Sequence, residues 1–479
     1  MSQNESESKK VIPIQAAEAD DEVMVSLYQA SKKIYPRSVK GVFANWRWFF
    51  VILTQVIYYG LPWMEWGARQ AVLFDLNARR FYIFGLVLYP QDFIYLTGLL
   101  VISALALFLF TAVAGRLWCG YACPQTVYTE IFMWIEHKIE GDRSARMRLD
   151  DGGMTADKLM KKSLKQLVWI TLSLWTGFTF VGYFAPIREL ANDLLLNQVS
   201  AWGLFWIFFY AFATYGNAGF MREQVCKYMC PYARFQSAMF DHDTLIVTYD
   251  AERGEPRGPR SKKTDLATSN LGSCVDCTLC VQVCPTGIDI RNGLQYECIG
   301  CGACADVCDE VMDKMGYARG LVRYTTQHAM ENKWGKAEVW KHVARPRVLI
   351  YTAILAVITL AVGISLAVRT PFKVDVVRDR ATLARITEDG AIENIYRLQV
   401  MNASEKEKTF ALTVEGLQDI RIATEPRVTI GPAEAHWLVV RVNIPYGSAE
   451  SGSQKIQFNI QDEGSSDVLH EKSVFLVPR

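Results

Sequence analysis

Long apolar segments interrupt a polar and charged background in the first 370 residues of the chain. A helix needs roughly 20 apolar residues to cross a bilayer core of about 30 Å. Five segments reach this length, are nearly uncharged and are flanked by Trp, Tyr, Arg or Lys. They are residues 42–63, 93–114, 167–187, 199–220 and 348–368. The pattern predicts a five-helix transmembrane α-bundle, with four helices in residues 41–240 and the fifth in residues 347–370.

Lysine and arginine are concentrated in alternate loops, and this bias predicts the orientation of the chain. Nine of these cations lie in residues 116–165, whereas residues 64–91 carry three. The N-terminus, residues 1–40, lacks the apolar core of a signal peptide and is expected to be flexible. We therefore expect the N-terminus, the 116–165 loop and residues 221–346 in the cytoplasm, with residues 371–479 on the opposite side.

Shorter patterns predict β-structure and one amphipathic helix. Residues 371–479 contain short β-rich pieces separated by turn signals, which is typical of an all-β immunoglobulin-like sandwich. The expected strands are residues 395–401, 409–414, 437–444, 455–460 and 474–477. Residues 81–89 are too short to cross a bilayer and are expected to form a strand pair or an interfacial piece. The helical spacing that follows Pro124 predicts an interfacial amphipathic helix.

The composition fits a chain that is partly membrane-embedded, because 51% of its 479 residues are apolar while 21% are charged. Lys plus Arg number 51 and Asp plus Glu 50, which excludes the basic balance of a nucleic-acid-binding protein. All twelve cysteines precede residue 371, and eight of them lie within residues 274–308. Such clustering indicates metal ligands rather than the disulfides of a secreted scaffold.

Two copies of the spacing Cys-x2-Cys-x2-Cys-x3-Cys follow one another in residues 274–308. In two-cluster ferredoxins the first three cysteines of a run hold one [4Fe-4S] cluster, and the fourth reaches the other cluster. The spacing therefore predicts a ferredoxin-like domain at residues 241–346 that binds two clusters. The first cluster is assigned to Cys274, Cys277, Cys280 and Cys308, and the second to Cys298, Cys301, Cys304 and Cys284.

Two structural zinc sites are the alternative, because sets of four closely spaced cysteines also bind zinc. The three-residue step before the last cysteine, and Pro285 after the first run, favour iron-sulfur clusters. The second run departs from the usual pattern, since Asp309 stands where a proline would follow. Three glycines are expected to let backbone amides approach the sulfurs: Gly287, Gly300 and Gly302.

The other four cysteines form two matched motifs, Cys119-x3-Cys123-Pro and Cys226-x3-Cys230-Pro, each following the expected cytoplasmic end of an apolar segment. Residues four apart share a helix face, so each motif is expected to present two thiols on one side. Soft thiolates select Cu(I), zinc or iron-sulfur centres, which makes these cysteines candidate redox and metal-binding residues. Buried structural thiols are the alternative.

His137 and His242 are weaker candidates for a metal near these thiols, because a single histidine at a membrane surface is more often solvated. The sequence contains no Cys-x-x-Cys-His haem-attachment motif, no glycine-rich dinucleotide fingerprint and no evident Ser/His/Asp arrangement. Electron transfer is the chemistry that remains.

Together, these features make the chain resemble the cytochrome c oxidase accessory protein family CcoG, also called FixG or RdxA. The resemblance runs from about residue 35 to the end of the chain. It includes Phe-Asp-Leu at 74–76, Pro-Gln-Asp-Phe at 90–93, Ile-Glu-Gly-Asp-Arg at 139–143 and Asp-Glu-Val-Met-Asp at 309–313.

The resemblance implies a multi-pass protein of the bacterial inner membrane that assists assembly of a cbb-type cytochrome c oxidase, acting as a cupric reductase. It implies two [4Fe-4S] clusters, a cytosolic electron donor, and oxidase subunits or copper-delivery proteins as partners. Copper would be held near Cys119, Cys123, Cys226 and Cys230. Two other functions stay open: a quinol-linked membrane electron relay, and a non-enzymatic assembly factor whose clusters act as redox sensors.

Overall fold

The computed structural model describes residues 33–262, 270–379 and 384–478. Most of the N-terminus that was predicted to be flexible, residues 1–32, lies outside the described residues. The chain divides into the units Met1–Ile34 and Tyr35–Arg479. All helices and strands described below belong to the second unit.

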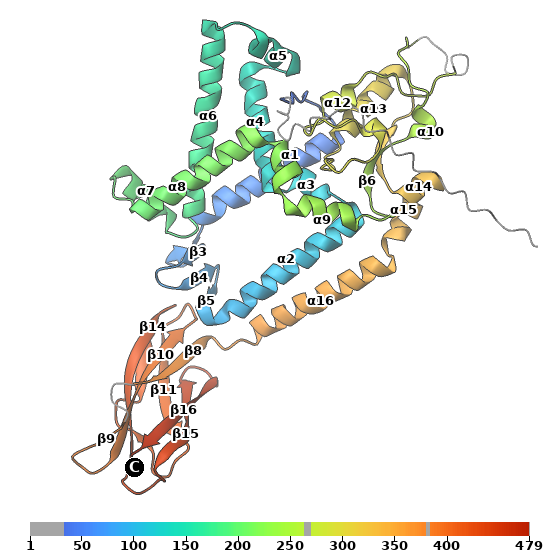
Figure 1. Ribbon diagram of the computed structural model, residues 1–479. Helices are drawn as coiled ribbons and strands as arrows, with labels where there is room; N and C mark the ends of the chain where they lie inside the picture. Colours follow the sequence, from blue (N-terminus) through green and yellow to red (C-terminus); the bar gives the residue numbers. More distant parts are fainter. Residues whose placement is uncertain (1–32, 263–269, 380–383, 479) are drawn as a thin grey trace, which may run out of the picture. The chain divides into compact units, whose positions relative to one another are not determined.

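Each predicted apolar segment contains a long helix (Figure 1). The five helices are α1 (Val42–Gly60), α2 (Phe93–Ala114), α6 (Ala156–Val181), α8 (Ala201–Thr214) and α16 (Pro346–Ala367). In the described part of the chain, two helical stretches are long and apolar enough to cross a membrane, Pro90–Ala114 and Pro346–Ala367. Polar residues interrupt α1 and the first half of α6, and α8 is 14 residues long. For these three helices, membrane crossing stays a prediction.

The long helices pack mainly as two pairs. α2 lies along α16, and α6 lies along α8 (Figure 1). Small residues allow the backbones to approach: a Cβ added at Gly98 would lie 2.9 Å from the Val362 side chain, and one at Gly177 would collide with the carbonyl oxygen of Ile207. α1 contacts α6. Among these five helices the most extensive contacts join α2 to α16 and α6 to α8, and the five-helix transmembrane bundle stays a prediction.

Both Cys-x3-Cys-Pro motifs lie where one helix ends and another begins. The elements around them are α3 (Leu117–Tyr121), α4 (Pro124–Glu140), α5 (Arg143–Asp151), η3 (Tyr215–Met221), η4 (Val225–Met229) and α9 (Pro231–Met239). Cys119 lies in α3 and Cys226 in the π-helical η4, whereas Cys123 and Cys230 have extended backbones and cap α4 and α9. A proline fits the first helical position because it has no N–H to donate. The two cysteines of each motif therefore lie at the junction of two helices, and not one turn apart on a single helix face.

α4 is the helix predicted after Pro124, but two of its acidic residues are buried rather than exposed to water. Glu136 forms ion pairs with Arg146 at 2.9 Å, Arg222 at 3.1 Å and Lys165 at 3.4 Å. Lys165 also pairs with Glu140 at 2.8 Å. Buried charges are tolerated when they are paired in this way. This buried ion network joins α4 to α5, α6 and the end of η3. The location of α4 at a membrane interface stays a prediction.

The cysteine-rich segment folds around a short antiparallel strand pair, β6 (Ile246–Tyr249) with β7 (Val322–Thr325). Its other elements are α10 (Ala251–Gly254), α12 (Leu279–Gln282), η5 (Ile290–Asn292), α13 (Ala303–Met315), α14 (Gln327–Glu331) and α15 (Lys336–Val343). Val247, Met312 and Leu321 are buried together with Cys274 and Cys280. The core of this domain therefore encloses the cysteine-bearing loops.

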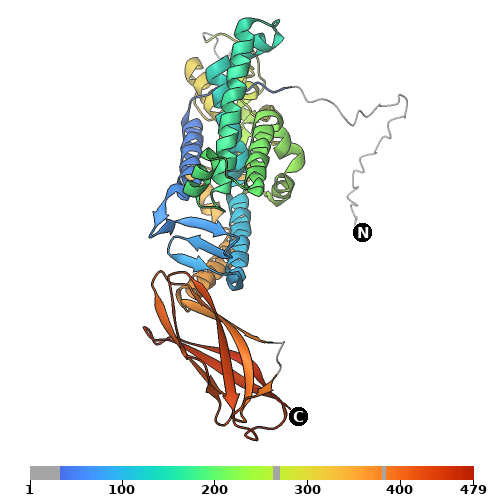
Figure 2. The ribbon, with the colours of Figure 1, turned by 90° about the vertical axis from the view of Figure 1, so that its left-hand side faces the viewer.

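Residues 371–379 and 384–478 form a two-sheet β-sandwich (Figure 2). One sheet has the order β12 (Arg421–Ile422), β14 (Ala435–Ile444), β10 (Ile392–Asn402), β8 (Phe372–Arg378), with β9 (Arg385–Ile386) on β10. The other has the order β13 (Arg427–Ile430), β11 (Lys408–Glu415), β15 (Gly452–Asp462), β16 (Val468–Val477). All five expected strands are confirmed. Their buried faces meet around fully buried Phe410, Phe458 and Phe475.

A small sheet precedes α2. Its region contains η1 (Leu61–Trp63), β1 (Glu65–Trp66), β2 (Arg69–Gln70), β3 (Val72–Asp75), β4 (Arg80–Ile83), β5 (Leu86–Leu88) and η2 (Pro90–Asp92), and α7 (Ile187–Leu195) follows α6. β4 pairs antiparallel with β5, so the strand pair predicted for residues 81–89 is confirmed.

Candidate metal centres

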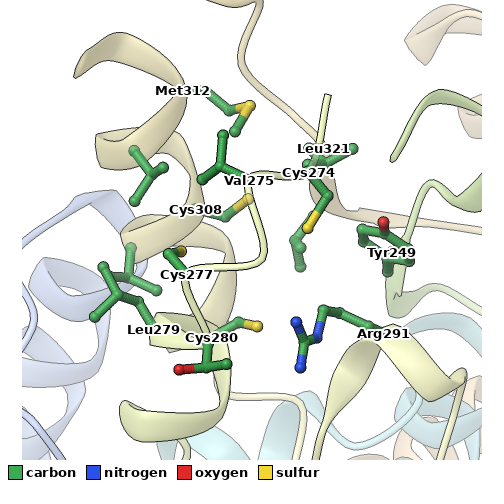
Figure 3. A pocket seen from close by; sticks show the side chains of 14 residues that line it. Tyr249, Cys274, Val275, Cys277, Leu279, Cys280, Arg291, Cys308, Met312 and Leu321 are labelled. Atoms are coloured by element: carbon green, nitrogen blue, oxygen red, sulfur yellow. The ribbon is translucent and has the colours of Figure 1, made fainter. Parts of the chain in front are cut away.

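Four cysteines line one cavity in the cysteine-rich domain (Figure 3). They are Cys274, Cys277, Cys280 and Cys308, the set assigned to the first cluster. The remaining wall is mostly apolar, with Leu279, Met312 and Leu321 among its side chains, and it contains no carboxylate. The Arg291 guanidinium also faces this space. We call it the first cavity.

The backbone explains how one short loop presents three of these thiols. Asp276 and Thr278 adopt left-handed conformations, with φ of 53° and 57°, so the chain reverses direction around Cys277. Such angles are unusual for residues other than glycine and need support from surrounding structure. Cys277 is exposed, whereas Cys274 and Cys280 are buried. The first cavity therefore has one ligand position at the protein surface.

A second cavity is lined by Cys284, Cys298, Cys301 and Cys304, the set assigned to the second cluster, together with Cys280 from the first set. This wall also contains no carboxylate. The Gly300 N–H donates to Cys298 Sγ at 3.4 Å, and the Thr286 hydroxyl lies 3.3 Å from Cys284 Sγ. The structure thus brings both predicted sets of thiols together, and it places Cys280 between the two cavities.

All three expected glycines adopt the left-handed backbone conformation that favours glycine, and Gly287 has a φ of 74°. Gly300 and Gly302 have φ of 63° and 74°, and a Cβ added at Gly302 would lie 2.8 Å from the Phe43 ring. Their backbone conformation lets the loop fold back onto its own sulfurs. Gly302 also caps α13, the helix that carries Cys304 and Cys308.

Burial makes these thiols difficult to ionise in the absence of a cation. It raises the pKa of Cys298 and Cys308 to about 12 and that of Cys280 to about 11. Iron would supply the missing positive charge, and a set of soft thiolate donors in an apolar wall suits an iron-sulfur cluster. The residues present therefore fit the predicted cofactors. Among the described residues, no group of three or more His, Cys, Asp or Glu is placed to hold a single metal ion.

The cysteines of the two Cys-x3-Cys-Pro motifs also come together, and we call them the thiol quartet. All four are half-buried. Burial raises the pKa of Cys119 to about 12, and the nearby Cys123 and Cys226 contribute to this rise. Burial likewise raises the pKa of Cys123, with a contribution from Cys230. The Cys119 thiol donates to Gln236 Oε1 at 3.3 Å.

The thiol quartet lies next to the second cavity. Cys119 packs against the apolar cluster that contains Ile299 and Cys301. A Cβ added at Gly120 would lie 2.9 Å from the carbonyl oxygens of Ile299 and Gly300, so α3 contacts the cluster loop directly. Cys226 shares another cavity with Ile299. The quartet and the second cluster set are therefore neighbours in space.

Sequence reasoning missed two buried arginines beside the second cavity. Arg47 pairs with Glu130 at 2.8 Å, and its charge lies close to the Cys301 thiol. Arg116 donates to the carbonyl oxygens of Tyr296, Cys298 and Ala233. Arg47 could have been noticed as a cation within an apolar segment, and Arg116 as the cation three residues before Cys119.

The structure gives the two candidate histidines other surroundings. His137 Nδ1 lies 3.8 Å from Asp142 Oδ1, and its ring lines a cavity to which, among the described residues, no cysteine contributes. His242 stacks on His328 with ring centroids 5.2 Å apart, and His328 bonds to Asp243 at 2.8 Å. Neither histidine is among the residues that line the cavity containing Cys226.

Comparison with protein-family models supports this picture of the metal centres. Residues 221–327 match a model described as a 4Fe-4S dicluster domain, and residues 96–141 match a 4Fe-4S binding domain. Residues 362–478 match an Ig-like fold at the C-terminus of FixG, described as a putative oxidoreductase. The site and these matches define an iron-sulfur electron-transfer protein with ferredoxin-type 4Fe-4S domains and a C-terminal Ig-like domain.

The relatives identify the family more narrowly. Nitrogen fixation protein FixG of Rhizobium meliloti is 38% identical over 489 residues, covering 94% of this chain and 93% of the relative. Protein RdxA of Cereibacter sphaeroides is 40% identical over 407 residues, covering 83% and 86%. The chain belongs to the FixG/RdxA family, as its sequence led us to expect. A crystal structure of a FixG-related protein from Vibrio parahaemolyticus is 26% identical, with a TM-score of 0.21, and covers 22% of this chain and 97% of its own.

Proposed function

We propose that this protein reduces Cu(II) to Cu(I) at the inner face of a bacterial inner membrane, in support of assembly of a cbb-type cytochrome c oxidase. One observation carries the proposal: the thiol quartet lies against the loop that supplies the second cluster set. Thiolates bind Cu(I) well because both are soft. A copper site built from them beside an electron carrier favours the reduced ion.

The reaction transfers one electron. A low-potential cytosolic donor loses it and Cu(II) gains it, so charge balances without a proton. When bound, the two clusters supply one-electron redox chemistry between these ends. The residues of the chain itself position the two ends of this path and keep water out of it. The loop around exposed Cys277 offers an entry side, the apolar walls of both cavities exclude water, and α3 brings Cys119 to the exit side.

Membrane insertion is part of the proposal. Two helices have the length and composition to cross a bilayer, and several helices carry exposed apolar side chains. Ile94 on α2 is 73% exposed, Phe212 on α8 is 76% exposed and Val357 on α16 is 66% exposed. Such surfaces are unfavourable in water and favourable in lipid. With five crossings, the cysteine-rich domain lies in the cytoplasm and the β-sandwich in the periplasm, where it can meet oxidase subunits or copper-delivery proteins.

Replacing Cys226 and Cys230 by serine tests the copper site. We expect anaerobically purified wild-type protein, reduced with dithionite and then freed of the reductant, to convert added Cu(II) to Cu(I), detected with a Cu(I)-specific chelating dye. The double variant should lose most of this activity and of its copper binding while keeping its iron-sulfur absorbance. His137→Ala and His242→Ala are the matched controls, since neither histidine is among the residues that line the cavity containing Cys226. Unchanged copper binding in the cysteine variant would remove the quartet from the mechanism.

One observation favours a second function, an electron relay in which quinol is the donor and copper is incidental. Residues 96–141 match a 4Fe-4S binding domain although they contain two cysteines, Cys119 and Cys123. Ferredoxin-type protein NapH of Haemophilus influenzae is 23% identical over 45% of this chain. Rapid cluster reduction by a quinol analogue, without any copper reduction by the reduced protein, would favour the relay over the cupric reductase.

A further inference from the structure

Arg116 lies between the second cavity and the thiol quartet, and its side chain is only 6% exposed. It precedes Cys119 by three residues, and its guanidinium donates to the carbonyl oxygen of Cys298 at 3.4 Å and to those of Tyr296 and Ala233. Ala233 follows Cys230 in α9. One side chain therefore connects both Cys-x3-Cys-Pro motifs to the cluster loop.

Tyr296 strengthens the same connection. Its hydroxyl donates to the carbonyl oxygen of Lys227 at 2.6 Å, next to Cys226 in the second motif. Its ring lies 5.9 Å from the Arg116 guanidinium carbon. The loop before Cys298 is thus tied to one motif through Tyr296 and to both through Arg116.

The charge of Arg116 has no carboxylate to balance it. Arg47, Arg146 and Arg222 are also buried, and each forms an ion pair with a glutamate within 3.1 Å. Arg116 forms no ion pair with any described residue, and its Nε is buried without a hydrogen-bond partner. An uncompensated buried charge costs several kcal/mol. Hydrogen bonds to three carbonyl oxygens offset part of that cost, and anionic groups in the adjoining sites would offset more of it.

Three thiols are among the groups that face Arg116. Its positive charge lowers the pKa of Cys298, Cys119 and Cys226, against the larger effect of burial. Cys298 belongs to the second cluster set, and the other two belong to the quartet. Thiolates on both sides of the guanidinium, with iron held on one side, would provide the missing negative charge.

We propose that Arg116 is a positioning residue that couples the second cluster to the thiol quartet: its charge raises the reduction potential of that cluster, and its fork holds the cluster loop against both motifs. A nearby cation stabilises the more negative, reduced form of a cluster. Arg291 faces the first cavity instead, but its charge is shared with Asp289 and Asp276. The coupling role assigned to Arg116 rests on the proposed function, but the experiment that tests this role requires no copper.

The test measures both cluster potentials by dithionite titration with EPR on full-length, anaerobically purified protein. In Arg116→Gln we expect one midpoint potential to become more negative and the other to stay unchanged. The control Arg291→Gln should move the other midpoint. If Arg116→Gln binds its full complement of iron and neither potential moves, the electrostatic part of the proposal is overturned.

Arg116→Lys separates the effect of the positive charge from that of the hydrogen-bond geometry. If Arg116→Gln fails to retain iron, this lysine variant tests the proposal instead. A lysine keeps the charge but cannot donate to Tyr296 and Ala233 together in the way that a guanidinium fork does. We expect both midpoints to stay near their wild-type values while maleimide alkylates Cys119 and Cys226 several-fold faster in copper-free protein. Alkylation at the wild-type rate would overturn the positioning role. Failure of the wild-type protein to reduce copper would instead refute the proposed function. The midpoint potentials and alkylation rates would still test the role of Arg116 in that case.

Discussion

Burial raises the pKa of Cys298 and Cys308 to about 12, so these ligands ionise near neutral pH only when a cation stabilises the thiolate. The positions of such ligands are encoded locally, because a regular spacing identifies them one by one. The role of Arg116 is not encoded locally, since its partner Ala233 is 117 residues away. The sequence therefore predicts the cluster ligands at the residue level, while the arginines around them become visible only once the chain has folded.

Gly120 tests the contact between α3 and the second cluster loop. In Gly120→Val the new side chain would meet backbone atoms of Ile299, Gly300 and Cys301 at 2.9 Å, and backbone cannot move aside easily. We expect destabilisation of about 1–3 kcal/mol and loss of iron from the second site. Iron and sulfide analysis measures this. Gly363→Val on α16 is the control, because a Cβ there would meet no atom within 4 Å, and equal iron contents would refute the contact.

Asp462 gives the β-sandwich a predictable pH dependence. Burial alone would raise the pKa of this carboxyl, but hydrogen bonds from Lys408, Gly464 and Ser465 outweigh it and hold the pKa below its usual value. The stability it contributes is present above the unfolded-state pKa of about 3.9 and is lost as pH falls through the lower folded-state value. Asp462→Asn should therefore unfold at lower temperature at neutral pH, with the difference from wild type shrinking at acid pH. A difference independent of pH would contradict this assignment.

At the scale of elements, the β-strands follow their sequence pattern closely and the helices around the motifs do not. The alternating side-chain pattern of residues 392–402 is retained in β10, because β14 and β8 both pair with this strand in a continuous antiparallel register. β8 was not among the expected strands, and it begins four residues after the last apolar segment ends. Residues 119–123 and 226–230 do not each lie on one helix, because a new helix begins at the proline after the second cysteine. The burial of one side of α4 could not be predicted from local sequence, because Arg222, which pairs with Glu136, is 86 residues away from it.

The buried ion network predicts how these helices respond to a lost charge. Glu136→Gln leaves Arg146, Arg222 and Lys165 with too little negative charge in a buried site. Breaking a buried pair typically costs 3–5 kcal/mol, so we expect about that loss of stability, measured as a lower unfolding temperature in detergent. Asp157→Asn is the matched control because its pair with Lys161 is exposed, and such a pair contributes about 0.3–0.5 kcal/mol. Equal effects of the two variants would show that the network does not stabilise this part of the protein.

At the scale of the whole molecule, the number of membrane crossings determines on which side each domain works. Five crossings place the two termini on opposite sides, whereas crossing by α2 and α16 alone would place them on the same side. Sequence patterns favour the larger number, since a helix forms in each of the five segments. The first half of α6 and parts of α1 are more polar than α2 and α16, and α8 has only 14 residues, so these three helices are the ones that decide the topology.

Reporter fusions decide between these topologies. We expect a fluorescent protein that folds only in the cytoplasm to be active at the N-terminus, and alkaline phosphatase, which requires the periplasm, to be active after residue 479. A phosphatase fusion in the loop after α4 is the control and should be inactive. An inactive C-terminal phosphatase with an active N-terminal fluorescent fusion would contradict five crossings.

The central claim is that the eight cysteines of residues 274–308 hold two [4Fe-4S] clusters that serve one-electron transfer. Anaerobic purification followed by iron, sulfide, zinc and copper analysis, with EPR of the dithionite-reduced protein, tests it most directly. We predict about eight irons and eight sulfides per chain and the EPR signals of two interacting reduced clusters. Colourless protein without iron, or protein with zinc bound to these thiols, would contradict it.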